Sequence, residues 1–160
     1  MYIFGLFYVM GLNIVLIEPE IPNNTGNIGR LALATNSRLH LVKPFGFEIS
    51  DAKLRRAGLD YWQHIDLEIY ESSDAFFSTH HNEPFVLFSS HGHKSHWDMK
   101  FEDGMFLIFG KESVGLSKSI TKTHSDKLYK IPMYSERIRS LNLANAVSIV
   151  CYEGLRQLGH

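Results

Sequence analysis

Residues 12–37 read LNIVLIEPEIPNNTGNIGRLALATNS, and this stretch sets a pattern that the rest of the chain repeats. Leu12–Ile17 is a short apolar run that predicts a buried strand, and Gly26–Ser37 predicts a helix. Short apolar runs and helical stretches alternate in this way up to the C-terminus. Such alternation is typical of α/β units, and it predicts a mainly parallel sheet with helices on both faces.

The remaining elements follow from the same reasoning. We expect strands at Leu39–Val42, Ile65–Tyr70, Phe85–Phe88, Met105–Phe109 and Leu128–Ile131, and helices at Ser50–Ala57, Ser73–His80 and Leu141–Leu158. Thr25 is the predicted N-cap of the first helix, and Ser72 or Ser73 is the predicted cap of the helix Ser73–His80.

The last helix carries a predicted apolar stripe that consists of Leu141, Ala144, Ser148, Cys151, Leu155 and Leu158. Packing on the chain's own sheet is the default role of this stripe, and contact with a second copy is the alternative. Cys151 lies on the stripe and is expected to be a small buried hydrophobe rather than a nucleophile.

Composition narrows the class of protein. The 160 residues include 44% hydrophobic ones, enough for the core of one domain and too many for a disordered chain. Sixteen basic against 17 acidic residues leave a net charge of -1, which excludes a polycationic nucleic-acid binder. The single cysteine excludes an internal disulfide. We therefore expect one domain over residues 1–160 in a reduced, cytoplasmic protein.

The start of the chain is strongly apolar. Tyr2–Ile17 is shorter than the roughly 20 residues that cross a bilayer and runs directly into Glu18, so membrane insertion is disfavoured. Met1–Val9 is expected to be an extension before the first strand, and Met10 is an alternative start.

Three loops carry residues suited to chemistry. Asn23–Arg30 offers a helix N-terminus for an anion, and Arg30 lies where it can hold phosphate or a ribose hydroxyl. A capped helix with a solvated arginine is the alternative. The loop lacks the Lys-Ser or Lys-Thr of a Walker loop and the spacing of a dinucleotide fingerprint.

The other two loops follow predicted strands. Gly110–Leu116 places Glu112 between two glycines that permit a tight backbone wrap, although an ordinary strand-to-helix turn is the alternative. Arg137–Ala146 puts two arginines before a helix start with Ser140 and Asn142, and Asn145 is a candidate for a polar role.

Two clusters are weaker candidates. His91, His93 and His96 have no nearby acidic residue or cysteine that completes a metal site, so we expect solvated histidines and no metal. Lys53–Arg56 with Tyr61 and Trp62 mixes cations and aromatics, as single-stranded RNA surfaces do, although a solvated basic helix face is the alternative.

Taken together, these loops resemble the three signature motifs of the SPOUT superfamily of RNA methyltransferases. The first motif matches Glu18–Arg30, the second Phe109–Leu116 and the third Ser140–Ser148. Leu54–Trp62 resembles a signature of the small branch that modifies the wobble nucleotide of tRNA. The resemblance runs from about Leu12 to His160.

The resemblance implies an α/β fold with a C-terminal trefoil knot, a homodimer, and S-adenosylmethionine that becomes S-adenosylhomocysteine. It implies cofactor contacts at Phe88, Gly110, Ile131 and Ser140, and 2′-O-methylation of the wobble ribose of a tRNA anticodon stem-loop. Arg30 would orient the hydroxyl, while Asn142, Glu112 and Tyr152 are supporting candidates and a neighbouring group or water takes the proton. The candidates for contact with RNA in a dimeric groove are Asn24, Arg55, Arg56, Arg137, Arg139 and Tyr152.

Other readings stay open at this point. The same fold can act on ribosomal or another RNA, or serve as a non-catalytic RNA-binding module. A small nucleotide-binding oxidoreductase is a third class, and the failed dinucleotide fingerprint argues against it.

Overall fold

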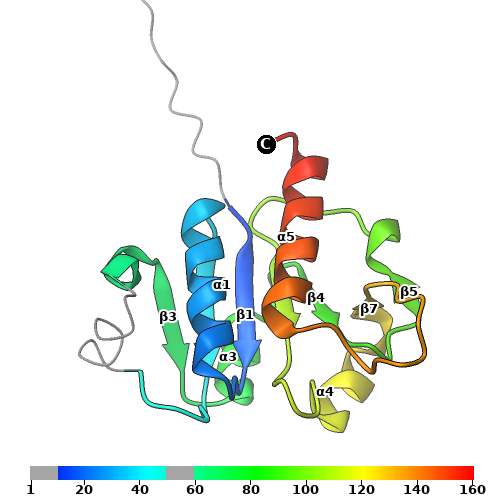
Figure 1. Cartoon of the computed structure of the whole chain (residues 1–160), viewed down its shortest axis with the longest axis horizontal. Helices are drawn as coiled ribbons and strands as arrows, with labels where there is room; N and C mark the ends of the chain where they lie inside the picture. The colour runs from blue at the N-terminus through cyan, green and yellow to red at the C-terminus, as the bar shows by residue number, and fades with distance from the viewer. Residues whose placement is uncertain (1–10, 50–59) are drawn as a thin grey trace, which may run out of the picture.

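The computed structural model describes residues 11–49 and 60–160, which form a parallel sheet between two layers of helices. The helices α1 (Pro22–Ala34) and α5 (Leu143–Leu158) lie side by side in front of the sheet in Figure 1. The helices α3 (Ser73–Thr79) and α4 (Lys118–Thr123) cover the other face. Helices on both faces confirm the predicted fold class.

The sheet of the described residues has seven strands in the order β3-β2-β1-β6-β4-β7-β5, and every pairing is parallel. The strands are β1 (Asn13–Ile17), β2 (Arg38–Val42), β3 (Leu67–Tyr70), β4 (Phe85–Phe88), β5 (Lys94–Ser95), β6 (Phe106–Phe109) and β7 (Leu128–Lys130). All four residues of β4 and of β6 are buried, as strands covered on both faces require. Three short 3-10 helices complete the elements: Asp60–His64, His96–Asp98 and Ser125–Lys127.

The two faces of the sheet have separate cores. On the α1/α5 face, Ile28 and Ala32 of one helix and Val147 and Cys151 of the other pack against the strands. On the opposite face, Phe76 of α3 and Ile120 of α4 pack against the strands. Cys151 is fully buried, as predicted, and burial raises the pKa of its thiol.

The predicted start and the predicted N-cap of the first helix are wrong, whereas the predicted cap of α3 is confirmed. Helix α1 begins at Pro22 with Ile21 as its N-cap, so Thr25 lies inside the helix and is buried. Proline fits the first helical position because the amide hydrogen it lacks has no partner there. Ser72 is confirmed as the cap of α3, since its side chain accepts a hydrogen bond from the backbone N–H of Ala75.

The predicted stripe on the last helix is also wrong in part. The buried residues of α5 are Ala144, Val147, Val150, Cys151 and Gly154. This stripe of small residues lets the helix approach the sheet closely: a Cβ at Gly154 would lie 2.7 Å from Phe101 and 2.8 Å from Leu12. Asn145 is exposed rather than buried, so it needs no internal partner.

Several elements were not expected from the sequence, and several expectations fall outside the described residues. Helix α4 and the two-residue strand β5 were not predicted. The helix Ser50–Ala57, the extension Met1–Val9, Arg55 and Arg56 lie outside the described residues. Within the described ranges, no helix is long and apolar enough to span a membrane.

Candidate functional site

A cavity of about 480 Å³ opens at the carboxyl ends of β4, β6 and β7. Ligands of open α/β sheets bind outside this edge, where loops from neighbouring strands meet. Phe88 and Phe109, the last residues of β4 and β6, stack with ring centroids 4.8 Å apart and line the cavity. Their flat apolar surface is suited to an aromatic ligand.

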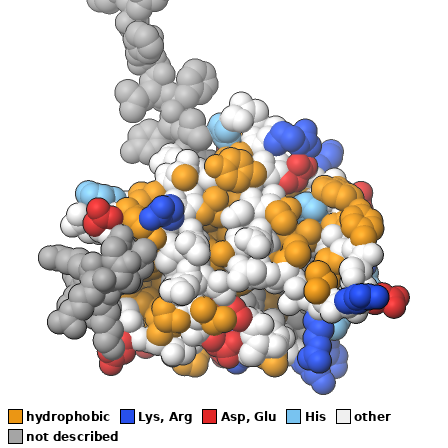
Figure 2. Space-filling view, in the orientation of Figure 1, with side chains coloured by type: hydrophobic (Ala, Val, Ile, Leu, Met, Phe, Trp, Pro, Cys, Tyr) orange, Lys and Arg blue, Asp and Glu red, His pale blue; other side chains and the backbone are white. Residues whose placement is uncertain are grey.

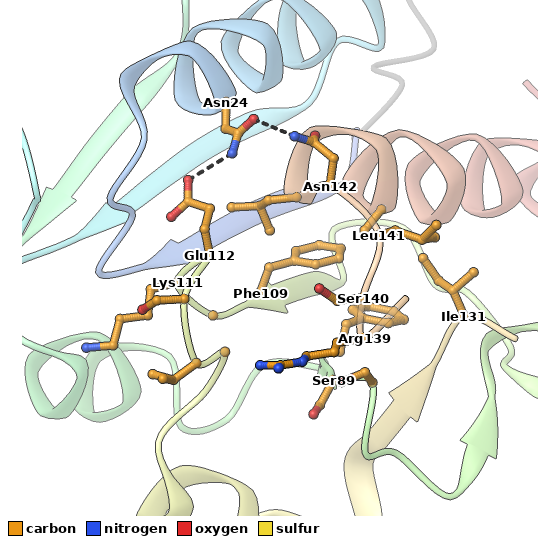
Figure 3. A pocket seen from close by; sticks show the side chains of 18 of the residues that line it. Asn24, Ser89, Phe109, Lys111, Glu112, Ile131, Arg139, Ser140, Leu141 and Asn142 are labelled. Atoms are coloured by element: carbon orange, nitrogen blue, oxygen red, sulfur yellow. Dashed lines mark hydrogen bonds between the residues drawn. The ribbon is translucent and has the colours of Figure 1, made fainter. Parts of the chain in front are cut away.

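The four residues expected to contact a cofactor all line this cavity. Phe88 ends β4, Gly110 follows β6, and Ile131 and Ser140 lie between β7 and α5, so the fold brings residues that are far apart in the sequence to one place. Ser140 and Ile131 are visible around the cavity in Figure 3, with Phe109 behind them. Asn24, Glu112, Arg139 and Asn142 also belong to the lining.

A chain of side-chain hydrogen bonds ties the three loops together (Figure 3). Asn142 Nδ2 donates to Asn24 Oδ1 at 3.0 Å, and Asn24 Nδ2 donates to Glu112 Oε1 at 3.1 Å. Asn142 Oδ1 also accepts from the backbone N–H groups of Ala144 and Asn145 and so caps α5. Asn142 therefore positions the start of α5, which is a structural role beside the catalytic one expected from the resemblance.

Glu112 fills the anion site at the start of α1. Its carboxylate accepts from the backbone N–H of Glu20 at 2.7 Å and from that of Ile21 at 3.1 Å. A negative charge from Glu112, about 90 positions away in sequence, therefore lies near the partially positive start of α1. A ligand anion at this helix start stays a prediction.

One ion pair and two hydrogen bonds also join the second loop to the segment before α1. Lys111 Nζ lies 2.8 Å from Glu18 Oε2, and this pair raises the pKa of Lys111. The backbone N–H and hydroxyl of Ser113 both donate to Glu20 at 2.9 Å, which lowers the pKa of Glu20. These residues were not predicted as partners, because nothing local in the sequence links the two loops.

The wrap of the second loop depends on its glycines. A Cβ at Gly110 would lie 2.2 Å from the backbone of Gly115 and Leu116, so only glycine allows the chain to return across this point. Gly115 has a φ of +71° and donates its N–H to the carbonyl oxygen of Lys111 at 2.9 Å. The predicted tight wrap is confirmed.

Arg30 lies outside the cavity of its own chain. It is exposed on α1, and its guanidinium lies 4.9 Å from the ring centroid of Tyr61. Tyr61 is itself fixed, since its hydroxyl donates to the carbonyl oxygen of Gly26 at 2.7 Å. The ring therefore holds the arginine on the outer side of α1.

The remaining candidates are dispersed. Arg139 lines the cavity and Figure 3 shows its guanidinium extending across it, whereas Arg137 is exposed and does not contribute to the lining. Tyr152 is 56% exposed on α5, away from the cavity.

The three histidines of the predicted cluster separate in the structure. His91 lines the cavity, His93 is exposed and His96 is buried. Burial lowers the pKa of His96. Among the described residues, no group of three or more His, Cys, Asp or Glu is arranged to hold a metal ion.

Residues after β4 were missed by sequence reasoning. Ser89, Ser90 and His91 line the cavity, and the backbone N–H of Ser89 donates to the carbonyl oxygen of Tyr129 at 2.9 Å. The position of this segment directly after a fully buried strand was the available signal.

Most of the chain matches one known protein family. The model of the SpoU rRNA Methylase family matches residues 11–152. The chain belongs to this family. The family fold accounts for the way in which three distant loops meet at one edge of the sheet. The trefoil knot implied by the resemblance stays a prediction.

Individual relatives are similar over nearly the whole chain. The chain is 45% identical to the tRNA (cytidine(34)-2'-O)-methyltransferase of Saccharophagus degradans, over 92% of this chain and 96% of that protein. A solved structure that concerns the 2-OH methylation of C/U34 on tRNA matches with a TM-score of 0.87 and 43% identity, covering 94% of this chain and 97% of the other.

A more distant structure holds the cofactor. The SpoU methyltransferase AviRb of Streptomyces viridochromogenes, in complex with AdoMet, matches with a TM-score of 0.78 and 27% identity. The match covers 93% of this chain and 58% of that one.

Proposed function

We propose that this protein transfers a methyl group from S-adenosylmethionine to the 2′-hydroxyl of the wobble nucleotide of tRNA, cytidine or modified uridine, in the cytoplasm. One observation carries the proposal: Phe88, Gly110, Ile131 and Ser140 converge on one cavity. This convergence occurs in a chain 45% identical to a tRNA (cytidine(34)-2'-O)-methyltransferase.

The residues of the cavity fit an adenosine-containing cofactor. The stacked rings of Phe88 and Phe109 offer an apolar face, and the half-buried Ile131 offers a second. The backbone groups of Gly110 and Ser140 lie in the lining, where they can bind the polar edge of a base. When bound, the cofactor supplies a methyl group on a positively charged sulfur and leaves as S-adenosylhomocysteine. No metal is part of this proposal.

The residues of the chain must orient the ribose hydroxyl and direct its proton away. Arg30 is the candidate for orientation, because its planar guanidinium can bind the hydroxyl and an adjacent phosphate together. It is not a proton acceptor, since guanidinium keeps its protons at any pH that the fold tolerates. The proton therefore leaves to water or to a neighbouring group.

Arg30 can reach a cofactor only if a second copy of the chain brings it there, and we propose a homodimer for this reason. Helices α1 and α5 present a charge-poor face: Arg30 is the only charged residue of Pro22–Ala34, and Leu143–Tyr152 carries none. Figure 2 shows this face with apolar and uncharged side chains at its centre and charged ones mostly at its rim. Ile149 and Tyr152 are 41% and 56% exposed on it, which favours contact with another surface.

The test is methyl transfer to unmodified tRNA with the product nucleotide mapped. We expect 2′-O-methylation at the wobble position of the anticodon loop. The Arg30→Ala variant should lose methylation while its affinity for S-adenosylmethionine, measured by calorimetry, stays nearly unchanged.

Mixed dimers test the shared site directly. Arg30→Ala and Gly110→Ala are each expected to be inactive alone, and mixing them should restore activity in dimers that combine one intact cavity with one intact Arg30. No recovery in a verified mixed dimer would contradict the shared site. Methylation of ribosomal RNA alone, or cofactor binding without transfer to any RNA, would replace the proposed substrate.

A further inference from the structure

The loop between β7 and α5 exposes two large side chains that proteins usually bury. Tyr134 is 87% exposed and Ile138 is 50% exposed. Across the cavity, Val114 of the second loop is 74% exposed. An aromatic ring and an aliphatic side chain that are exposed to water on one loop indicate contact with something that is not part of this chain.

This loop is continuous with the cavity. Met133, the residue before Tyr134, belongs to the lining, and so do Arg139 and Ser140 at the far end of the loop. Tyr134 and Ile138 therefore lie on a segment whose two ends line the cavity. The backbone N–H of Arg137 donates to Ser135 Oγ at 3.3 Å, which shapes the turn between them.

The charges beside the exposed ring favour a nucleic acid as its partner. Arg137 and Arg139 flank Ile138, and Tyr134 lies three residues before Arg137, with one carboxylate, Glu136, between them. Aromatic rings interleaved with arginines are the chemistry of single-stranded RNA surfaces, where rings stack on bases and guanidinium groups bind phosphates.

We propose that Tyr134 stacks on an unpaired base next to the target nucleotide, while Arg137 and Arg139 bind the phosphates that join the two. This inference rests on the proposed function and deepens it, because it assigns recognition of the anticodon loop to residues outside the cofactor contacts. Stacking fixes the neighbouring base and so places the target ribose at the mouth of the cavity.

The test uses the full-length protein and an unmodified tRNA. Tyr134→Ala and Tyr134→Leu should raise KM for tRNA about 5- to 150-fold, the range that corresponds to loss of one base–aromatic stack. Tyr134→Phe should stay near wild type, since the ring is retained. The affinity for S-adenosylmethionine should not change in any of the three. Trp97→Ala, which removes another exposed aromatic from outside the cavity lining, is the matched control.

A second measurement reports stacking itself. 2-Aminopurine placed on either side of the target nucleotide should be quenched on binding to the wild type and to Tyr134→Phe, and much less on binding to Tyr134→Leu. An abasic site at the same position should remove the difference in KM between the wild type and Tyr134→Ala.

The outcomes separate this inference from the proposed function. Unchanged KM in Tyr134→Ala and Tyr134→Leu overturns the inference, and so does a parallel loss of cofactor affinity or dissociation of the dimer in these variants. A wild type that binds RNA through Tyr134 but methylates no tRNA overturns the proposed function and supports the stacking role.

Discussion

Replacing Glu112 tests whether its carboxylate holds the site together. The carboxylate accepts hydrogen bonds from the N–H groups of Glu20 and Ile21 and from Asn24 Nδ2, at 2.7, 3.1 and 3.1 Å. In Glu112→Ala all three donors lose their partner, and the segment that leads into α1 loses its contact with the second loop. Because two of the contacts are only partly buried and the third is exposed, we expect a total loss of about 2–4 kcal/mol, below the roughly 4.5 kcal/mol that is the low end for three hydrogen bonds to a charged group.

Thermal unfolding and cofactor calorimetry measure the two consequences. For a chain of this length, that loss lowers Tm by about 4–16 °C. Affinity for S-adenosylmethionine should fall as well, since Glu112 positions the loop that lines the cavity. Glu112→Gln keeps an acceptor oxygen and should lose about half as much stability.

Two comparisons make the result decisive. Glu102→Ala removes an exposed carboxylate elsewhere and should stay within about 0.5 kcal/mol of the wild type. In a double-mutant cycle, Glu112→Ala and Asn24→Ala should be strongly non-additive, because both break one network. Stability of Glu112→Ala equal to that of Glu102→Ala would refute the reasoning.

Three further predictions address single residues. Burial beside Arg38 and His80 lowers the pKa of His40 from 6.5 to about 3. As the pH falls, the unfolded chain therefore takes up a proton on this histidine before the folded chain does. Stability should therefore fall as pH drops below 6.5, by about 1.4 kcal/mol per pH unit, and urea unfolding of His40→Gln should lack this component. Cys151 should resist a thiol reagent in the native protein and react on unfolding, and rapid native labelling would contradict its burial. Gly110→Ala should abolish cofactor binding by backbone collision, whereas Gly115→Ala, with open space around its Cβ but a φ of +71°, should cost only about 1–3 kcal/mol of stability.

Local sequence signals predicted the elements with strong patterns. The strands Phe85–Phe88 and Phe106–Phe109 are buried on both faces, so their apolar runs are unbroken and easily found. Strand β5 has only two residues, Lys94 and Ser95, and takes its place from pairing with β7 rather than from hydrophobicity. No pattern of apolar residues marks such a strand.

The errors at the helices have the same physical origin. The start of α1 was misplaced because Glu112, which binds the N–H groups of Glu20 and Ile21 directly before the helix, is distant in sequence. The stripe on α5 was misplaced because leucines mark an apolar face in the sequence, whereas the sheet accepts the small residues Ala144 and Gly154 at close approach. In both cases a tertiary contact overrides the local preference.

The position of Arg30 gives the proposed homodimer a role in the reaction. Each chain forms its own cavity, but the group proposed to orient the ribose stands on the outer face of α1, held by Tyr61. A single chain can then bind the methyl donor without a side chain that aligns a nucleophile beside it. Holding the two reacting groups in line contributes much of the rate of such a transfer. A lone chain has no side chain that aligns an acceptor, so we expect transfer of the methyl group to water to be slow. Asn24 of α1 and Asn142, the N-cap of α5, form one wall of the cavity. A second copy that docks on α1 and α5, as proposed, would therefore contact elements that also line the cavity. In the proposed homodimer, the reaction would therefore need both subunits with RNA in place.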